Sequence, residues 1–165
     1  MDQQIKITVS EQSLEFSCSE HFTISFNRDQ EAAQAKPYLT PCPTLPAEIG
    51  AELQGGIYVG PMVENGRLVH LIAAEESIGK VKWEQAKELA SDYEGGDYSD
   101  WYLPNKDELA IALAHSKSKF ESGWHWTSTP YGSSVAWAVG FEYGDVYHWG
   151  RGNEFLVRPF RRLSI

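Results

Sequence analysis

Residues 122–131 bring together the side chains of this sequence best suited to chemistry: tryptophans, a histidine and several hydroxyl groups. His125 stands shortly before Ser128, and a histidine can act as the general base for a nucleophilic serine. Such a serine often stands on a glycine-flanked turn, and Ser128 has no glycine beside it. We therefore expect a structural or contact-making role for His125, with no catalytic residues, and predict that the chain is not an enzyme.

Metal binding is a second kind of chemistry to consider. Four carboxylates gather in a glycine-containing segment, at Asp92, Glu94, Asp97 and Asp100. Hard oxygen donors of this kind can hold calcium, but their spacing does not follow the EF-hand pattern. We predict a solvated acidic loop with no metal and no cofactor, and calcium binding at residues 92–100 stays an open alternative.

The sequence has two cysteines, Cys18 and Cys42. Their spacing matches neither a metal site nor a redox motif. We expect two free thiols, and a disulfide between them stays open where the compartment allows it.

Binding chemistry is better represented than catalysis, because the segment from Trp124 to Arg162 holds four of the six tryptophans. Trp, Tyr and Arg dominate the energetic hot spots of protein interfaces. Strand alternation would place Trp124 and Trp126 on one face and His125 and Thr127 on the other, and a purely structural role for both tryptophans is the alternative. The predicted contact patch is formed by Tyr143, Tyr147, His148, Trp149 and Arg151, together with Trp124 and His125.

Composition excludes several classes of partner and location. The chain has 165 residues, enough for one domain with an appendage, and a formal net charge of −9. Direct binding of nucleic acid is disfavoured because neutralising phosphates needs clustered Lys and Arg. No apolar run is long enough to span a membrane, and residues 1–6 lack the basic start of a secretory signal. We expect a cytoplasmic protein or one incorporated into a virion.

The N-terminal part alternates apolar and polar residues with period two over residues 5–9, 14–18 and 22–26. This pattern predicts a three-stranded antiparallel meander, assigned to residues 1–36. Its apolar face needs a cover, so it could mediate a homo-oligomer. Four prolines follow between residues 37 and 46, which predicts an extended connector over residues 37–54.

The pattern of residues 55–165 predicts an α+β domain. Strands at residues 57–59 and 68–73 are joined by Asn65-Gly66, a strong hairpin signal. A first helix carries apolar residues at helical spacing from Trp83 to Tyr93. A second helix begins after Asn105, which can form a capping box with Glu108. A second meander is predicted from three further strands, at residues 135–141, 146–149 and 155–158.

Several short motifs occur in the order in which they are found in a known family. They are Gly55-Gly56-Ile57-Tyr58-Val59-Gly60, the helix with Trp83 and Ala86, Trp101-Tyr102-Leu103-Pro104-Asn105-Lys106-Asp107-Glu108-Leu109, Trp126-Thr127-Ser128-Thr129, Ala136-Trp137-Ala138-Val139-Gly140-Phe141 and Val157-Arg158-Pro159-Phe160-Arg161. Over residues 50–162 the chain resembles the Lcl C-terminal domain family. This family looks like a branch of the C-type-lectin-like superfamily, found in bacterial adhesins, surface proteins and phage or prophage proteins.

The resemblance implies a C-type-lectin-like fold with two helices and antiparallel sheets. It assigns Trp101, Trp126, Trp137 and Arg158 to the core, and we expect an acidic partner such as Asp107 or Glu108 for Arg158. The sugar-binding motifs of calcium-dependent C-type lectins are absent. Formylglycine-generating enzymes have a related core that uses cysteines, but both cysteines here precede the matching region.

The leading functional hypothesis is a non-catalytic binding module of phage or prophage origin, whose aromatic C-terminal hairpin recognises a host or virion protein or a surface glycan. A second hypothesis, motivated by the net charge of −9, is an acidic intracellular inhibitor of a host defence or nucleic-acid enzyme. An enzyme of unknown reaction is a further alternative.

Overall fold

The computed structural model describes residues 4–9, 12–17, 22–24, 39–41 and 45–163. The chain divides into two compact units, Met1–Thr44 and Leu45–Ile165, and this division falls within the segment predicted as a connector. The predicted domain boundaries at residues 37 and 55 stay predictions, and Cys18 and Cys42 lie outside the described residues. Within the described residues, no helix is long and apolar enough to cross a membrane.

In the first unit the strands form two separate pairs. β1 (Gln4–Val9) pairs antiparallel with β2 (Gln12–Ser17), whereas β3 (Phe22–Ile24) pairs with β4 (Leu39–Pro41). The prediction of one three-stranded meander is therefore wrong in its third strand, because β3 takes its partner from the proline-containing segment. Proline is tolerated there, since a strand in a two-stranded pair has a free edge that needs no N–H donor.

The second unit contains a four-stranded sheet in the order β13-β7-β6-β5. Its strands are β5 (Glu52–Leu53), β6 (Gly56–Glu64), β7 (Arg67–Ala73) and β13 (Phe160–Leu163). Asn65 and Gly66 join β6 to β7 with φ values of 50° and 76°, so the predicted hairpin is confirmed.

A five-stranded sheet has the order β11-β10-β9-β12-β8. Its strands are β8 (Gly79–Val81), β9 (Trp124–Pro130), β10 (Val135–Gly140), β11 (Asp145–Gly150) and β12 (Phe155–Val157). β11 is an edge strand, and no described strand pairs with its outer side.

Two helices follow β8, as the periodicity predicts. α1 (Trp83–Ser91) buries Trp83, Ala86 and Ala90. α2 (Lys106–Ser116) begins with the predicted capping box, in which Asn105 accepts from two first-turn amides and Glu108 accepts from the backbone N–H of Asn105. A short 3-10 helix, η1 (Lys117–Lys119), follows α2.

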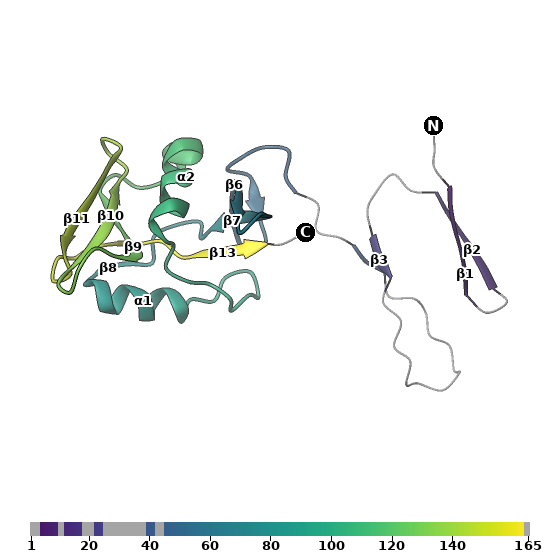
Figure 1. Ribbon diagram of the computed structural model, residues 1–165, viewed down its shortest axis with the longest axis horizontal. Helices are drawn as coiled ribbons and strands as arrows, with labels where there is room; N and C mark the ends of the chain where they lie inside the picture. Colours follow the sequence, from purple (N-terminus) through teal and green to yellow (C-terminus); the bar gives the residue numbers. More distant parts are fainter. Residues whose placement is uncertain (1–3, 10–11, 18–21, 25–38, 42–44, 164–165) are drawn as a thin grey trace. The chain divides into compact units, whose positions relative to one another are not determined.

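In the core of this unit, α2 packs between the two sheets and α1 packs on the five-stranded sheet. Figure 1 shows α2 between the β10–β11 end of one sheet and the β6–β7 pair of the other. One buried cluster, around α2, includes Val59, Leu71 and Leu109. A second lies around Trp83 and Trp126, where α1 packs on the five-stranded sheet. The α+β class is confirmed.

The predicted second meander is wrong in its last strand. β12 does not pair with β11. It lies between β9 and β8, parallel to β9 and antiparallel to β8. The physical reason is Arg158, which follows β12 and donates to the carbonyls of Ala74, Glu75 and Lys119. These acceptors hold the end of β12 beside the buried core, away from the edge hairpin.

Candidate functional site

The β10–β11 hairpin is built so that small residues face the core and large rings reach the surface. Ala136 and Ala138 are fully buried in the cluster around Trp126. The opposite face of β10 carries Trp137, which lies directly across from His148 in the register of the hairpin. This alternation gives the hairpin an outer aromatic face.

Four rings at this end of the five-stranded sheet form what we call the aromatic platform: Tyr131, Trp137, Tyr147 and His148. The Tyr131 and His148 rings stack at a centroid distance of 4.0 Å and an angle of 5°, and Tyr147 stacks on His148 at 4.5 Å and 19°. Trp137 meets Tyr131 and His148 edge-on at 5.2 and 5.7 Å. Tyr131 and Tyr147 are 56% and 51% exposed, so the platform is a surface feature.

Trp149 and Trp124 continue the aromatic contacts towards the interior. Their rings meet edge-on at 5.4 Å, and both contact Phe155. Both tryptophans are half-buried and pack against the core cluster around Trp126. Trp149 also supports Tyr147, because the two rings meet edge-on at 5.8 Å.

His125 was predicted as a partner-binding residue, and the structure corrects this because its side chain is fully buried. The imidazole lies edge-on to Phe141 and Phe120. Its Nε2 lies 3.4 Å from the Ser77 hydroxyl and 3.6 Å from a Glu121 carboxylate oxygen. His125 is therefore a core residue, and the alternation that separates it from Trp124 and Trp126 is as predicted.

Arg151 and Tyr143 lie outside the platform. Arg151 donates to the Gly132 carbonyl and to Glu84, and its guanidinium lies 4.0 Å from the centroid of the Trp83 ring. These contacts fix it against α1 and leave it a mainly structural role. Tyr143 lies in the turn between β10 and β11, is 80% exposed and makes no ring contact with the described residues.

The prediction placed Trp137 in the core and omitted Tyr131 from the patch. The structure places both in the platform, with Trp137 half-buried and the Lys106 amine 5.2 Å from its ring centroid. The turn at Gly144-Asp145 could have revealed Trp137, because continuing the hairpin register from that turn brings Trp137 opposite His148.

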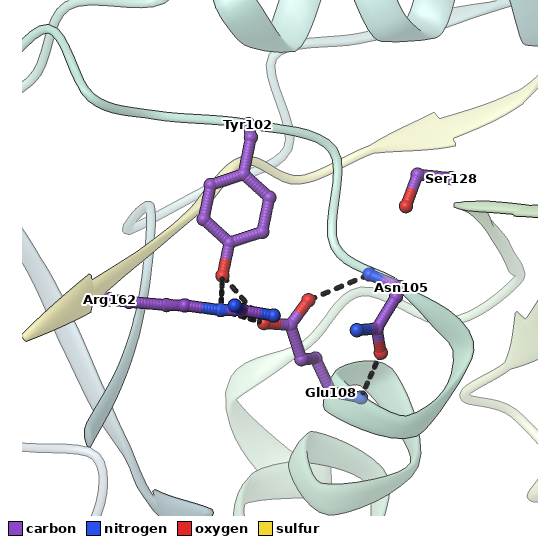
Figure 2. A pocket seen from close by; sticks show the side chains of 5 residues that line it. All are labelled: Tyr102, Asn105, Glu108, Ser128 and Arg162. Atoms are coloured by element: carbon purple, nitrogen blue, oxygen red, sulfur yellow. Dashed lines mark hydrogen bonds and ion pairs between the residues drawn. The ribbon is translucent and has the colours of Figure 1, made fainter. Parts of the chain in front are cut away.

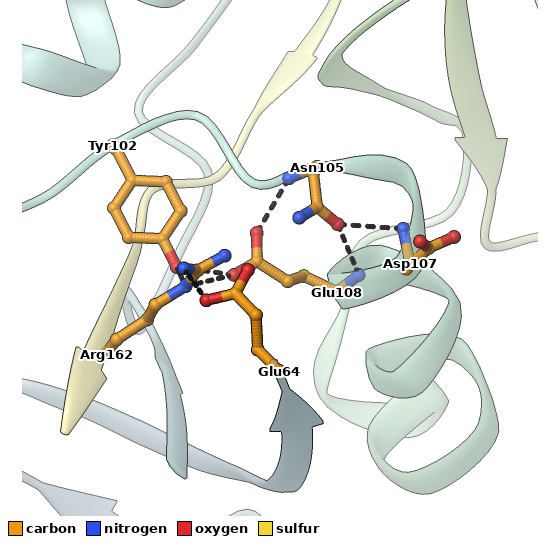
Figure 3. A network of polar contacts seen from close by, with 6 residues as sticks. All are labelled: Glu64, Tyr102, Asn105, Asp107, Glu108 and Arg162. Carbon is orange, nitrogen blue, oxygen red and sulfur yellow. Dashed lines mark hydrogen bonds and ion pairs between the residues drawn. The ribbon is translucent and has the colours of Figure 1, made fainter. Parts of the chain in front are cut away.

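Beside α2, a network of polar side chains surrounds a fully buried carboxylate (Figure 3). Glu108 accepts from the Tyr102 hydroxyl at 2.6 Å and from Arg162 Nε at 2.8 Å. Its other carboxylate oxygen accepts from the backbone N–H of Asn105. Arg162 makes a second ion pair with Glu64. Burial and the Glu108 carboxylate raise the pKa of Tyr102 far above its ordinary value. Although burial opposes it, Glu108 raises the pKa of Arg162.

Four residues of this network line a hollow of about 270 Å³, namely Tyr102, Asn105, Glu108 and Arg162, with Ser128 on the opposite wall. Figure 2 shows the side chains of Asn105, Ser128 and Arg162 around this space. Apart from the capping box, no sequence pattern predicts the hollow, because Arg162 and Ser128 reach α2 from distant strands.

Arg158 was expected to pair with Asp107 or Glu108, and this is wrong. Its acidic partner is Glu121, at 3.2 Å, in addition to three backbone carbonyls. Glu121 also accepts from the backbone N–H of Ser77 at 2.7 Å. The His125 contact and this N–H outweigh burial and lower the pKa of Glu121 far below its ordinary value.

The acidic loop has one member in a defined interaction. Asp100 accepts from Arg161 at 2.7 and 3.1 Å, which lowers the pKa of this carboxyl group despite its partial burial. Over the described part of the chain, no group of three or more His, Cys, Asp or Glu side chains is arranged to hold a metal ion.

Comparison with known proteins identifies one family. The family model of the Lcl C-terminal domain matches residues 64–161, more than half of the chain. No curated protein matches the chain. The matched range contains the whole aromatic platform and the Glu108 network except Arg162, which follows its last residue.

Proposed function

The chain belongs to the Lcl C-terminal domain family, which suggests a binding or adhesin-like module, and from this premise we propose that residues 45–165 form a non-catalytic binding module that recognises a partner protein through the aromatic platform. The observation that carries the proposal is the exposed stack of Tyr131, His148 and Tyr147. Such rings offer much apolar area with little conformational entropy to lose on binding.

The platform has the composition of an interface hot spot. Exposed aromatic residues that are already held by neighbouring rings need little further ordering, so more of their contact energy remains for binding. Val146, beside Tyr147 on β11, is also exposed and extends the apolar area. A surface patch of this kind on an otherwise acidic chain favours contact with another protein.

The stacking geometry favours a protein over a carbohydrate. A sugar ring usually packs against the open face of an aromatic ring, but each face between Tyr131, His148 and Tyr147 is covered by the next ring at 4.0 or 4.5 Å. The ring edges, the tyrosine hydroxyls and the outer faces of Tyr131 and Tyr147, on which no other described ring stacks, are left for contact. These suit the mixed polar and apolar groups of a protein surface, and a surface glycan is the alternative ligand.

A non-catalytic role is supported by the position of the candidate catalytic residues. His125 is fully buried and faces Ser77 and Glu121 through the same nitrogen, Nε2, with no partner for Nδ1 among the described residues. In a catalytic triad the acid and the nucleophile lie on opposite imidazole nitrogens. The arrangement therefore suits a structural histidine better than a general base.

The same proposal includes the fold superfamily, the origin and the location of the protein. We assign residues 45–165 to the C-type-lectin-like fold, supported by two helices packed on mainly antiparallel sheets. We also propose a phage or prophage origin, with the protein in the cytoplasm or in a virion and its partner a host or virion protein. The resemblance stated from the sequence motifs supports this assignment.

The test is capture from a bacterial lysate and from purified virions by the immobilised full chain, followed by mass spectrometry. Tyr131→Ala and Tyr147→Ala should each reduce capture of a specific protein at least tenfold. Tyr143→Ala, an exposed tyrosine of the same hairpin outside the stack, is the matched control and should capture normally. Equal capture by all four proteins would refute the site.

A second candidate function is inhibition of a host enzyme through an acidic surface, which the net charge of −9 favours. Capture that disappears with added salt and ignores the tyrosine substitutions would support it. Capture that resists salt and needs Tyr131 would support the platform instead, because contacts between apolar rings are little affected by ionic screening.

A further inference from the structure

We propose that the hollow lined by Tyr102, Asn105, Glu108, Ser128 and Arg162 is a second binding site, distinct from the aromatic platform, for an uncharged hydroxyl-rich ring such as a hexopyranose. The hollow measures about 270 Å³, enough for one such ring with some water. Its floor is the Glu108 network, which is rigid because the carboxylate is fully buried and hydrogen-bonded on both oxygens.

Asn105 caps α2 through its side-chain oxygen and leaves its side-chain nitrogen to face the hollow. Its Oδ1 accepts from the N–H groups of Asp107 and Glu108 and caps α2. Its Nδ2 makes no hydrogen bond with the described residues, and Figure 2 shows this nitrogen on the side of the hollow. The cap holds the amide plane in place, so a fixed N–H donor is offered to a ligand.

Ser128 supplies a matching group across the hollow. Its backbone N–H donates to the Pro104 carbonyl, which fixes the residue, while its hydroxyl has no hydrogen-bond partner among the described residues. Figure 2 shows this hydroxyl directed toward the space above Asn105. A hydroxyl can both donate and accept, so Ser128 and Asn105 together match a ligand whose groups do the same.

Charge decides against ionic ligands. An anion would lie near the Glu108 and Glu64 carboxylates, and a cation would lie near the Arg162 guanidinium. With two carboxylates and one guanidinium the network carries a net charge of −1, which disfavours an anion, and each charged group is already paired within the network, so none is left unpaired to hold a cation. The Tyr102 ring adds an apolar wall. A neutral ring with hydroxyls on its rim and C–H groups on its face meets both requirements.

The test is ligand-observed NMR with the full chain and the methyl glycosides of glucose, galactose and mannose, with galacturonate as the anionic comparison. Binding of at least one neutral glycoside, and weaker binding of galacturonate, is expected. Asn105→Asp keeps the acceptor that caps α2, removes the amide donor and adds a negative charge, so Ser128→Ala serves as the uncharged companion variant. This substitution and Ser128→Ala should each weaken binding about three- to tenfold, as the loss of one hydrogen bond predicts.

Matched measurements separate this site from the platform. Tyr131→Ala should bind the glycoside normally, and thermal unfolding should show that Asn105→Asp remains folded. If none of the neutral glycosides bind, or if binding is unchanged in both hollow variants, the inference is overturned. Binding of an N-acetyl amino-acid amide in place of every sugar would also overturn it, since the hollow would then suit a peptide.

Discussion

Tyr147 and His148 are consecutive residues of an edge strand, yet their rings stack at 4.5 Å. Side chains of successive strand residues normally point to opposite faces. Their stacking therefore requires the two rings to turn towards each other around the free edge of β11. Tyr131 also stacks on His148, and we expect the three rings to shield the edge of β11, whose outer backbone groups no described strand pairs with.

Removing this cover should promote self-association. The double variant Tyr147→Ala/His148→Ala is expected to expose the outer edge of β11, while the hydrogen bonds between β11 and β10 stay intact. Unprotected edges pair with other strands, so sedimentation velocity should show more concentration-dependent association than in the wild type. Tyr143→Ala serves as the control, and a double variant that sediments like the wild type would contradict the edge-covering role.

Glu108 should be essential for stability. Glu108→Ala leaves the Arg162 guanidinium without its fully buried carboxylate partner and removes half of the capping box. Breaking a buried ion pair by removing one partner costs about 3–5 kcal/mol of unfolding free energy. Urea denaturation measures the change.

The matched control for Glu108 lies next to it in the first turn of α2. Asp107 is exposed and shares the favourable helix-terminus position, so Asp107→Ala should cost less than about 1 kcal/mol. Similar losses for the two variants would mean that burial of Glu108 contributes little.

Replacing Arg158 by lysine tests whether the fold needs the planar guanidinium or only its positive charge. It is 2% exposed and donates through three nitrogens to backbone carbonyls and Glu121. Lysine keeps the charge but lacks the planar fork, so Arg158→Lys should lower the unfolding free energy by about 3 kcal/mol or more. Arg67→Lys, at an exposed hairpin position, should change it by less than about 0.5 kcal/mol.

Local signals predicted the elements that depend on neighbouring residues. Asn65-Gly66 forms its hairpin and Asn105 forms its capping box with Glu108, because each motif needs only a few consecutive residues. The alternation of Trp124 and His125 was also correct. It could not show which face is buried, since α1 covers one side and Phe120 and Phe141 cover the other.

Features that depend on distant partners could not be predicted. Arg162 reaches Glu108 across 54 positions, and Arg158 reaches Ala74 across 84. The sequence contains many acids that could pair with either arginine, so composition does not choose among them. The place of β12 in the sheet follows from the Arg158 contacts and was missed for the same reason.

The acid stability of the protein should depend on Glu121. Its pKa is lowered in the folded state by His125 and the Ser77 N–H, so its stabilising contribution is present above the unfolded pKa of about 4.3. This contribution is lost as the pH falls towards the folded pKa, because the unfolded chain then binds the proton first. Glu121→Gln should therefore destabilise at neutral pH, and the difference from the wild type should shrink progressively below about pH 4. Thermal unfolding across a pH series measures this, with the exposed Glu154→Gln as control. A difference that is constant with pH would show that the Glu121 charge is not what stabilises the fold.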